Sequence, residues 1–152
     1  MNFLSSKKIS WMLLVAWMLL IFFMSQKPGD ESTKQSNFVI YIFNFIGINL
    51  DKSLGDLASF IVRKAAHFSE YMILFFLGFN LLRHYINSKK IFLYAILVVF
   101  LYACSDEFHQ LFVIGRAGQF KDVLIDTSGG VFGAAITFIL LKLNVLKLKI
   151  DF

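Results

Sequence analysis

Residues 91–110 read IFLYAILVVFLYACSDEFHQ, and this stretch decides the fold. It begins with an apolar run, Ile91 to Cys104, that contains no charged residue, and it then places Asp106, Glu107 and His109 close together. A helix needs about 20 residues to cross the hydrocarbon core of a bilayer, so the uncharged run alone is too short. A complete crossing must include the acids and the histidine in its last turns. Ionisable residues at this depth are costly and usually mark a functional site.

The composition is typical of a membrane protein. Of the 152 residues, 58% are hydrophobic and 16% are charged, whereas soluble domains contain about 45–50% apolar and about 25% charged residues. The length predicts a single unit over residues 1–152. A net charge of +5 could indicate nucleic acid, but the basic residues lie singly or in pairs around the apolar segments. They are better explained as positive flanks of membrane helices, so we expect the lipid bilayer, and no nucleic acid, as a partner.

The apolar segments predict an all-α fold, namely a polytopic membrane protein with a bundle of four transmembrane helices. We expect these helices near residues 9–25, 57–82, 91–110 and 122–143. The first of them follows Lys7 and Lys8, as the apolar part of a signal peptide also would. Its end, Phe22 to Gln26, lacks the small residues that a signal peptidase requires. We therefore expect an uncleaved anchor helix.

A further apolar segment, residues 38–50, is too short to cross the membrane. Asn44 and Gly47 interrupt it, and its length falls below the roughly 20 residues of a crossing. We expect a short interfacial or re-entrant helix here. The polar residues 26–37 before it hold Pro28, the only proline, which marks the end of the preceding helix.

Four crossings place both termini on the same side of the membrane. Lys and Arg residues are almost equally numerous on the two sides, so their count alone does not orient the protein by the positive-inside rule. Basic residues that closely flank helix ends, such as Lys89 and Lys90, favour the side of the termini as the inside. We therefore expect a multi-pass protein of the cytoplasmic (inner) membrane with both termini in the cytoplasm.

In this topology, polar side chains from three predicted helices meet at the outer face. Residues three or four apart share a helix face. The polar stripes are Lys64, His67 and Glu70; Asp106, His109 and Gln110; and Asp122 with Asp126. Gly129 and Gly133 follow in a pattern that lets helices approach closely. We expect these glycines to bring Asp126 toward His67 and His109.

The stripes have a structural explanation as well as a functional one. A buried network of ion pairs would lower the cost of placing charges near lipid. Its basic members would be Lys64 and Arg116, and its acidic members would be Asp106, Asp122 or Asp126. Two histidines beside several carboxylates exceed what pairing requires, which favours ligand binding or chemistry.

Five segments carry a family resemblance: RKAAHFSEY (63–71), SDEFHQ (105–110), Gly115-Arg116, DVLID (122–126) and Gly129. In order and spacing they resemble the VanZ-like family, small bacterial membrane proteins whose founding member is associated with low-level resistance to the glycopeptide teicoplanin. The resemblance extends over nearly the whole chain and implies a membrane protein of the cell envelope without naming a reaction. The polar residues that match family positions are Lys64, His67, Glu70, Asp106, Glu107, His109, Gln110, Arg116, Asp122 and Asp126.

One hypothesis is a protein that binds cell-envelope lipids or antibiotics. Its outer face would bind a polar headgroup, a lipid-linked wall precursor or a glycopeptide antibiotic, and would thereby lower glycopeptide susceptibility. Lys64 and Arg116 would receive anionic groups such as phosphate. The full ligand-binding set is Lys64, Gln110, Arg116, Asp122 and Asp126.

The alternative hypothesis is a hydrolase or transferase of a lipid-linked substrate. The candidate catalytic residues are His67, Glu70, Asp106, Glu107 and His109. A divalent metal cofactor stays open, because imidazole and carboxylate together suit Zn²⁺ or Mn²⁺; its candidate ligands are His67, Glu70, Asp106 and His109. Without a metal, His109 would act as general base, held by Asp106. A proton-coupled carrier is disfavoured because the inner halves of the predicted helices lack charges leading to the cytoplasm.

Overall fold

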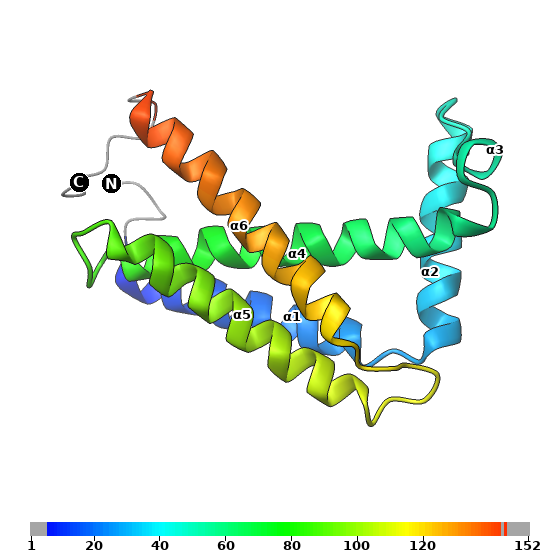
Figure 1. Cartoon of the computed structure of the whole chain (residues 1–152), viewed down its shortest axis with the longest axis horizontal. Coiled ribbons are helices and arrows are strands. Elements are labelled where there is room, and N and C mark those ends of the chain that lie inside the picture. Colours follow the sequence, from blue (N-terminus) through cyan, green and yellow to red (C-terminus); the bar gives the residue numbers. More distant parts are fainter. Residues whose placement is uncertain (1–5, 144, 146–152) are drawn as a thin grey trace.

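The computed structural model describes residues 6–143 and residue 145. The expected single unit of residues 1–152 therefore includes positions outside the described residues. The described part is helical, and the order of its elements is α1, α2, α3, η2, α4, α5 and α6 (Figure 1).

Four of the helices are long and apolar enough to cross a membrane. They are α1 (Lys7–Ser25), α4 (Ala58–Leu82), α5 (Lys90–Gln110) and α6 (Phe120–Lys142). The predicted all-α membrane bundle with four transmembrane helices is therefore confirmed. The predicted ends lie within one or two residues of the observed ends, which is the usual uncertainty of helix limits.

The prediction of a short helix at residues 38–50 is wrong in its limits. Helix α2 (Gly29–Phe45) begins directly after Pro28 and includes most of the polar stretch that precedes the apolar segment. Asp30 and Glu31 lie in its first turn, where the helix dipole favours negative charge. These acids and the proline are features of a helix start. The prediction missed this start because the segment is polar.

Gly47 ends α2 by turning the chain sharply. It has a φ of 93°, a left-handed conformation that glycine adopts without steric cost. The N–H of Gly47 donates to the Asn44 carbonyl at 3.1 Å, and the N–H of Ile48 donates to the Phe43 carbonyl at 2.9 Å. This pair of hydrogen bonds is a Schellman motif, which satisfies the last carbonyls of a helix.

Helix α2 lies crosswise at one end of the bundle (Figure 1). Its buried residues are Ser32, Ser36 and Ile40, and it packs against α4. This direction fits an interfacial helix rather than a re-entrant one, because a helix across the ends of membrane-spanning helices runs along the membrane surface. The short α3 (Leu50–Leu54) and η2 (Gly55–Leu57) then lead into α4.

Glycines let α6 pack closely against α4 and α5. A Cβ atom at Gly129 would overlap the backbone carbonyl of Phe68 on α4, and one at Gly130 would lie 2.8 Å from Val99 Cγ1 on α5. The expectation that these small residues bring α6 against its neighbours is confirmed. The close approach holds the first turns of α6 beside the first half of α4.

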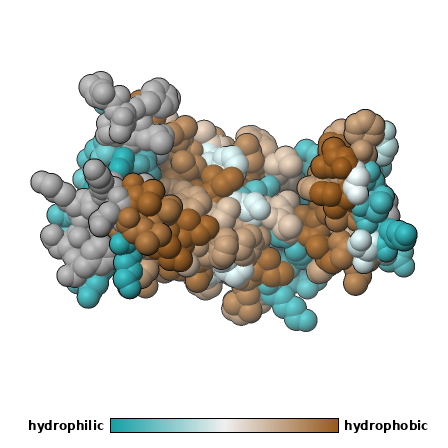
Figure 2. Space-filling view, turned by 90° about the horizontal axis from the view of Figure 1, so that it is seen from above, coloured by the Kyte–Doolittle hydropathy of each residue, from teal (hydrophilic) through white to brown (hydrophobic). Residues whose placement is uncertain are grey.

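Apolar side chains fill the bundle and also cover its outside. Tyr71 and Phe75 on α4 are completely buried, whereas Met12, Leu93 and Phe132 on the neighbouring helices are more than half exposed. Hydrophobic surface extends along much of the bundle (Figure 2). Such a surface is unfavourable in water and is what helices in contact with lipid require.

The ends of the four long helices lie at the two opposite ends of the bundle. Helices α1 and α5 end, and α4 and α6 begin, at the end of the bundle where α2 lies (Figure 1). The polar residues that the sequence predicts at the site belong to the helix segments at this end of the bundle and to the loop of residues 111–119, which connects α5 to α6.

Candidate functional site

The last turn of α5 forms a buried hydrogen-bond network with α1. Asp106, Glu107 and Gln110 are each at most 5% exposed. Gln110 Nε2 donates to Asp106 Oδ2 at 3.1 Å, to Glu107 Oε1 at 3.3 Å and to Ser25 Oγ at 2.8 Å. Ser25 Oγ in turn donates to Asp106 Oδ2 at 2.9 Å. The amide of Gln110 therefore holds both carboxylates in place, and the end of α1 contributes to the site through Ser25.

Glu107 connects α5 to the start of α6. Its second carboxylate oxygen, Oε2, accepts a hydrogen bond of 2.9 Å from the backbone N–H of Gln119, the residue that precedes α6. A Cβ at Gly118 would overlap the Glu107 backbone carbonyl, so the loop lies directly against α5. Both oxygens of this carboxylate thus have partners: Gln110 of α5 holds Oε1, and Oε2 holds the end of the loop.

The loop of residues 111–119 also contacts the start of α2. Gly115 has a φ of 72°, and a Cβ at Gly29 would overlap the Gly115 carbonyl. The N–H of Gly29 donates to the Ile114 carbonyl at 3.2 Å. Next to this contact, Arg116 Nε donates to the Lys27 carbonyl at 3.1 Å. The Gly115-Arg116 motif therefore lets two backbone segments touch and places a guanidinium beside their contact.

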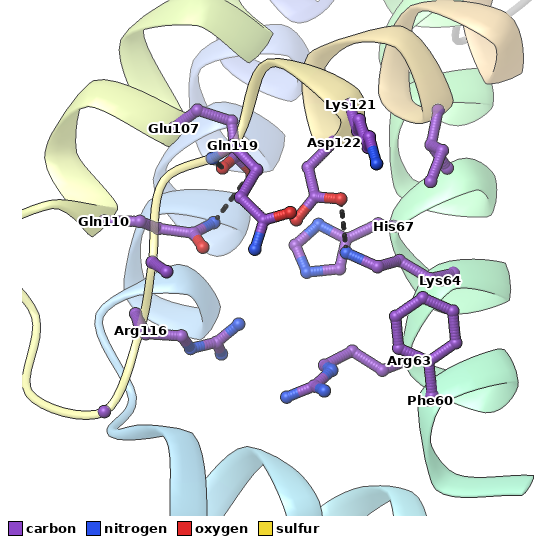
Figure 3. A pocket seen from close by; sticks show the side chains of 13 residues that line it. Phe60, Arg63, Lys64, His67, Glu107, Gln110, Arg116, Gln119, Lys121 and Asp122 are labelled. Carbon is purple, nitrogen blue, oxygen red and sulfur yellow. Dashed lines mark hydrogen bonds and ion pairs between the residues drawn. The ribbon is translucent and has the colours of Figure 1, made fainter. Parts of the chain in front are cut away.

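A partly open cavity of about 360 Å³ lies between α4, the loop and α6. Figure 3 shows Arg63 and Arg116 directed toward each other from opposite walls. The charged and polar residues of the lining are Arg63, Lys64, His67, Glu107, Gln110, Arg116, Gln119, Lys121 and Asp122. A single cavity therefore gathers residues that the sequence distributed over three polar stripes and the loop.

Lys64 of the cavity lining forms an ion pair, whereas the two guanidiniums form none within the described part of the chain. Lys64 Nζ lies 2.5 Å from Asp122 Oδ1, one of the pairs that the network explanation allowed. Neither Arg63 nor Arg116 forms an ion pair with a described carboxylate. Burial, and then the positive charge of Arg63, lower the pKa of the Arg116 guanidinium, although arginine stays protonated in proteins. Arg63, which was not among the residues expected at the site, lies in the cavity wall.

A second group, formed by His67, Asp106 and Asp126, lies deeper among the helices. One possible ligand atom of each lies within 4.8 Å of those of the other two. His67 Nδ1 is 3.8 Å from Asp126 Oδ1 and 4.0 Å from Glu70 Oε2, both longer than a hydrogen bond. His67 Nδ1, Asp126 Oδ2 and the Tyr71 hydroxyl are buried without a hydrogen-bond partner among residues 6–143 and 145.

His109 is not one of the three residues whose ligand atoms converge. The His109 ring packs against Phe22 of α1, with ring centroids 4.7 Å apart. Asp126 takes part instead, because the glycines of α6 bring its first turns onto α4. Of the metal ligands expected from the sequence, His67 and Asp106 belong to the group, Glu70 borders it, and His109 lies outside it.

A second cavity, of about 140 Å³, lies between α2 and α4. It shares Arg63, His67 and Arg116 with the larger cavity. These three side chains therefore stand between two spaces at the same end of the bundle.

Comparison with known proteins identifies a family. The family model described as VanZ/LLP1 matches residues 10–141, from α1 to the last turn of α6. Neither the curated proteins nor the solved structures contain a significant match. Because the matched region covers most of the chain, including nearly all of the four long helices and all the site residues described above, the chain belongs to the VanZ/LLP1 family.

Proposed function

We propose that this protein binds the phosphate-bearing headgroup of an envelope lipid or lipid-linked wall precursor at the outer face of the cytoplasmic membrane. The observation that carries the proposal is the pair of guanidiniums, Arg63 and Arg116, that face one cavity and have no ion-pair partner among the described carboxylates. Two like charges directed at the same space repel each other, and an anion between them would remove that repulsion.

Arginine suits this ligand chemistry. Its planar guanidinium donates two parallel hydrogen bonds to a phosphate. Lys64 is neutralised by Asp122, whereas Lys121 on the rim adds another positive charge. The cavity of about 360 Å³ falls within the range of small-molecule sites, about 300–1,000 Å³.

The position of the cavity supports a lipid headgroup as its ligand. It lies at the ends of the four long helices, beside the crosswise α2. The basic residues that flank the opposite helix ends, including Lys89 and Lys90, favour that opposite side as cytoplasmic. The cavity then faces outward, where wall precursors are used.

The direct test is lipid binding by purified protein in nanodiscs. Native mass spectrometry would compare a long-chain polyprenyl phosphate with the polyprenol of the same length. We expect binding that requires the phosphate and that falls by about 10-fold or more in Arg63→Gln and Arg116→Gln, because each change removes charge-assisted hydrogen bonds worth about 1.5–3 kcal/mol. Lys34→Gln is the matched control, since this exposed lysine pairs with Asp30 on α2 away from the cavity.

Two outcomes would contradict the proposal. Equal binding of the polyprenol and its phosphate would remove the role of the anion. Equal binding by the wild type and Arg116→Gln would remove the role of the guanidinium.

A consequence in cells would be lower susceptibility to glycopeptides of the teicoplanin type, which act on wall precursors. Expression of the wild-type protein in a sensitised bacterial host should raise the inhibitory concentration of teicoplanin. Arg116→Gln should lose this effect at equal protein level in the membrane.

A second candidate function, hydrolysis or transfer of the bound headgroup, is favoured by the group of His67, Asp106 and Asp126. Imidazole and carboxylates beside an anion site are the side chains that general acid–base or metal-assisted chemistry requires. Release of inorganic phosphate from a polyprenyl diphosphate, lost in Asp126→Asn, would support this function over binding alone.

A further inference from the structure

The side chains of His67, Asp106 and Asp126 converge on a common point without bonding to one another. They come from α4, α5 and α6, and one ligand atom of each lies within 4.8 Å of the others. The His67 Nδ1–Asp126 Oδ1 separation of 3.8 Å exceeds the roughly 2.7–3.2 Å of a hydrogen bond. The three groups therefore face a shared space.

Two of the converging groups have atoms that lack partners. Asp126 is 1% exposed, and its Oδ2 accepts no hydrogen bond from any residue that the structure describes. His67 Nδ1 is buried and also unpartnered. Burial of polar atoms without partners costs about 1–3 kcal/mol each, and more for charged groups, so the arrangement is unfavourable unless something occupies the space between them.

The third group, Asp106, is oriented by its neighbours. Ser25 Oγ and Gln110 Nε2 both donate to Asp106 Oδ2, at 2.9 and 3.1 Å. Metal-binding carboxylates in proteins are commonly held by such hydrogen bonds from surrounding residues. Helix packing alone does not require a carboxylate that is held in this way opposite an imidazole and a second carboxylate.

We propose that His67, Asp106 and Asp126 bind one divalent transition-metal ion. One imidazole and two carboxylates are the donors that Zn²⁺ and Mn²⁺ accept, and two carboxylates balance the charge of a divalent ion in a buried place. With metal–ligand bonds of about 2.1 Å, ligand atoms of a tetrahedral ion lie roughly 3.4 Å apart. Small side-chain movements would bring the present atoms to that spacing.

The ion would lie next to the anion cavity. His67 is a member of the metal group and also lines the cavity that holds Arg63 and Arg116. Three protein ligands leave a coordination position open, and a phosphate oxygen in the cavity would be the group to fill it. Only this last step rests on the proposed function; metal binding itself does not.

The test uses full-length protein purified in mild detergent without a polyhistidine tag. The protein is stripped of metal with EDTA, equilibrated with Mn²⁺ or Zn²⁺ alone and separated from the free ion. The bound metal is then measured by inductively coupled plasma mass spectrometry. We expect about one ion per chain for the wild type and at least about 100-fold weaker retention by Asp126→Asn, because even residues that only support a ligand change affinity by about 10–100-fold.

A second measurement separates lost binding from lost folding. Stripped Asp126→Asn should melt no lower than the stripped wild type, because the change removes a buried carboxylate with an unpartnered oxygen, and the added metal should raise the melting temperature of the wild type alone. His84→Gln is the matched control, since His84 lies just beyond the C-terminal end of α4, where its Nε2 is 3.3 Å from Ser10 Oγ, and it should retain the ion. Retention by Asp126→Asn equal to that of the wild type, or no stoichiometric ion in the wild type, would overturn the metal site.

The result is independent of headgroup binding. Metal retention together with failure of Arg116 to affect polyprenyl phosphate binding would leave the metal site standing and refute the anion site. Phosphate-dependent lipid binding by a protein that retains no ion would support the anion site and refute the metal site.

Discussion

Lys64 on α4 and Asp122 on α6 form an ion pair of 2.5 Å at the wall of the cavity. Their side chains are 19% and 18% exposed, so the pair is neither fully in water nor fully buried. It links the two helices whose glycine contacts bring the site together. The pair also neutralises the lysine that the sequence favoured as an anion ligand, so the proposed anion site depends on the two arginines.

Breaking this pair should destabilise the bundle. We expect Lys64→Met or Asp122→Asn alone to lower the free energy of unfolding by about 1–3 kcal/mol, because each leaves a partly buried charge without its partner. The double variant should lose less than the sum of the single losses, with a coupling of about 1 kcal/mol or more. Thermal unfolding of the four proteins in one detergent measures this cycle, and strict additivity would contradict the pairing.

Gly129→Ala should weaken the packing of α6 on α4. The new Cβ would meet the Phe68 carbonyl, so the helices must move apart, at a cost of about 1–3 kcal/mol. Gly78→Ala on α4 is the control, because a Cβ there has nothing within 4 Å. That change should be neutral or stabilising by up to about 1 kcal/mol, as alanine favours helix over glycine. Similar melting temperatures for the two variants would disprove the close contact.

Tyr71→Phe and Tyr102→Phe should have different effects. The Tyr71 hydroxyl is buried without a partner, so its removal should be neutral or slightly stabilising. The Tyr102 hydroxyl donates to the Met18 carbonyl of α1, so its removal should cost about 1 kcal/mol. Thermal unfolding in detergent distinguishes the two. A loss of stability in Tyr71→Phe as large as that in Tyr102→Phe would mean that the Tyr71 hydroxyl has a partner.

Glu107→Ala should loosen the loop that carries Arg116. The change removes the acceptor of the Gln119 N–H, a hydrogen bond to a charged group worth about 1.5–3 kcal/mol. If local opening limits proteolysis, trypsin should cleave after Arg116 about tenfold faster or more, as followed by mass spectrometry of the fragments. Asp56→Ala, at an exposed acid of η2, should cleave at the wild-type rate. An unchanged rate in Glu107→Ala would show that this carboxylate does not hold the loop.

The proposed orientation predicts opposite labelling of two engineered cysteines. A membrane-impermeant maleimide added to intact cells should label Lys34→Cys on the exposed face of α2 and should not label Lys89→Cys at the other end of the bundle. Both variants should carry Cys104→Ser, because Cys104 is the only native cysteine. Labelling of Lys89→Cys alone would place the cavity on the cytoplasmic side of the membrane and refute the outward-facing site.

The helices were predictable because their signal is local. An uncharged apolar run is visible in the residues themselves. The run before Asp106 is shorter than a membrane crossing, so the acids had to lie in the last turns of α5. The start of α2 was missed because its first residues are polar. Their helical structure depends on Asp30 and Glu31 in the first turn, on the turn at Gly47 and on packing against α4.

The membership of the site was only partly predictable. Spacing along a helix shows which residues share a face, as for Asp106 and Gln110. It does not show how that face is rotated toward its neighbours, so His109 was expected in the group but lies against Phe22, while Ser25 was not expected and holds Asp106.

The sequence by itself determined a four-helix membrane bundle of the VanZ/LLP1 family with polar residues at one end, because length, hydropathy and motif order are properties of the chain alone. Only the tertiary structure decided which of those residues meet. The rotation of each helix and the approach of α6 at Gly129 depend on packing between segments far apart in the chain. That packing sets Arg63 opposite Arg116 and brings Asp126, rather than His109, to His67.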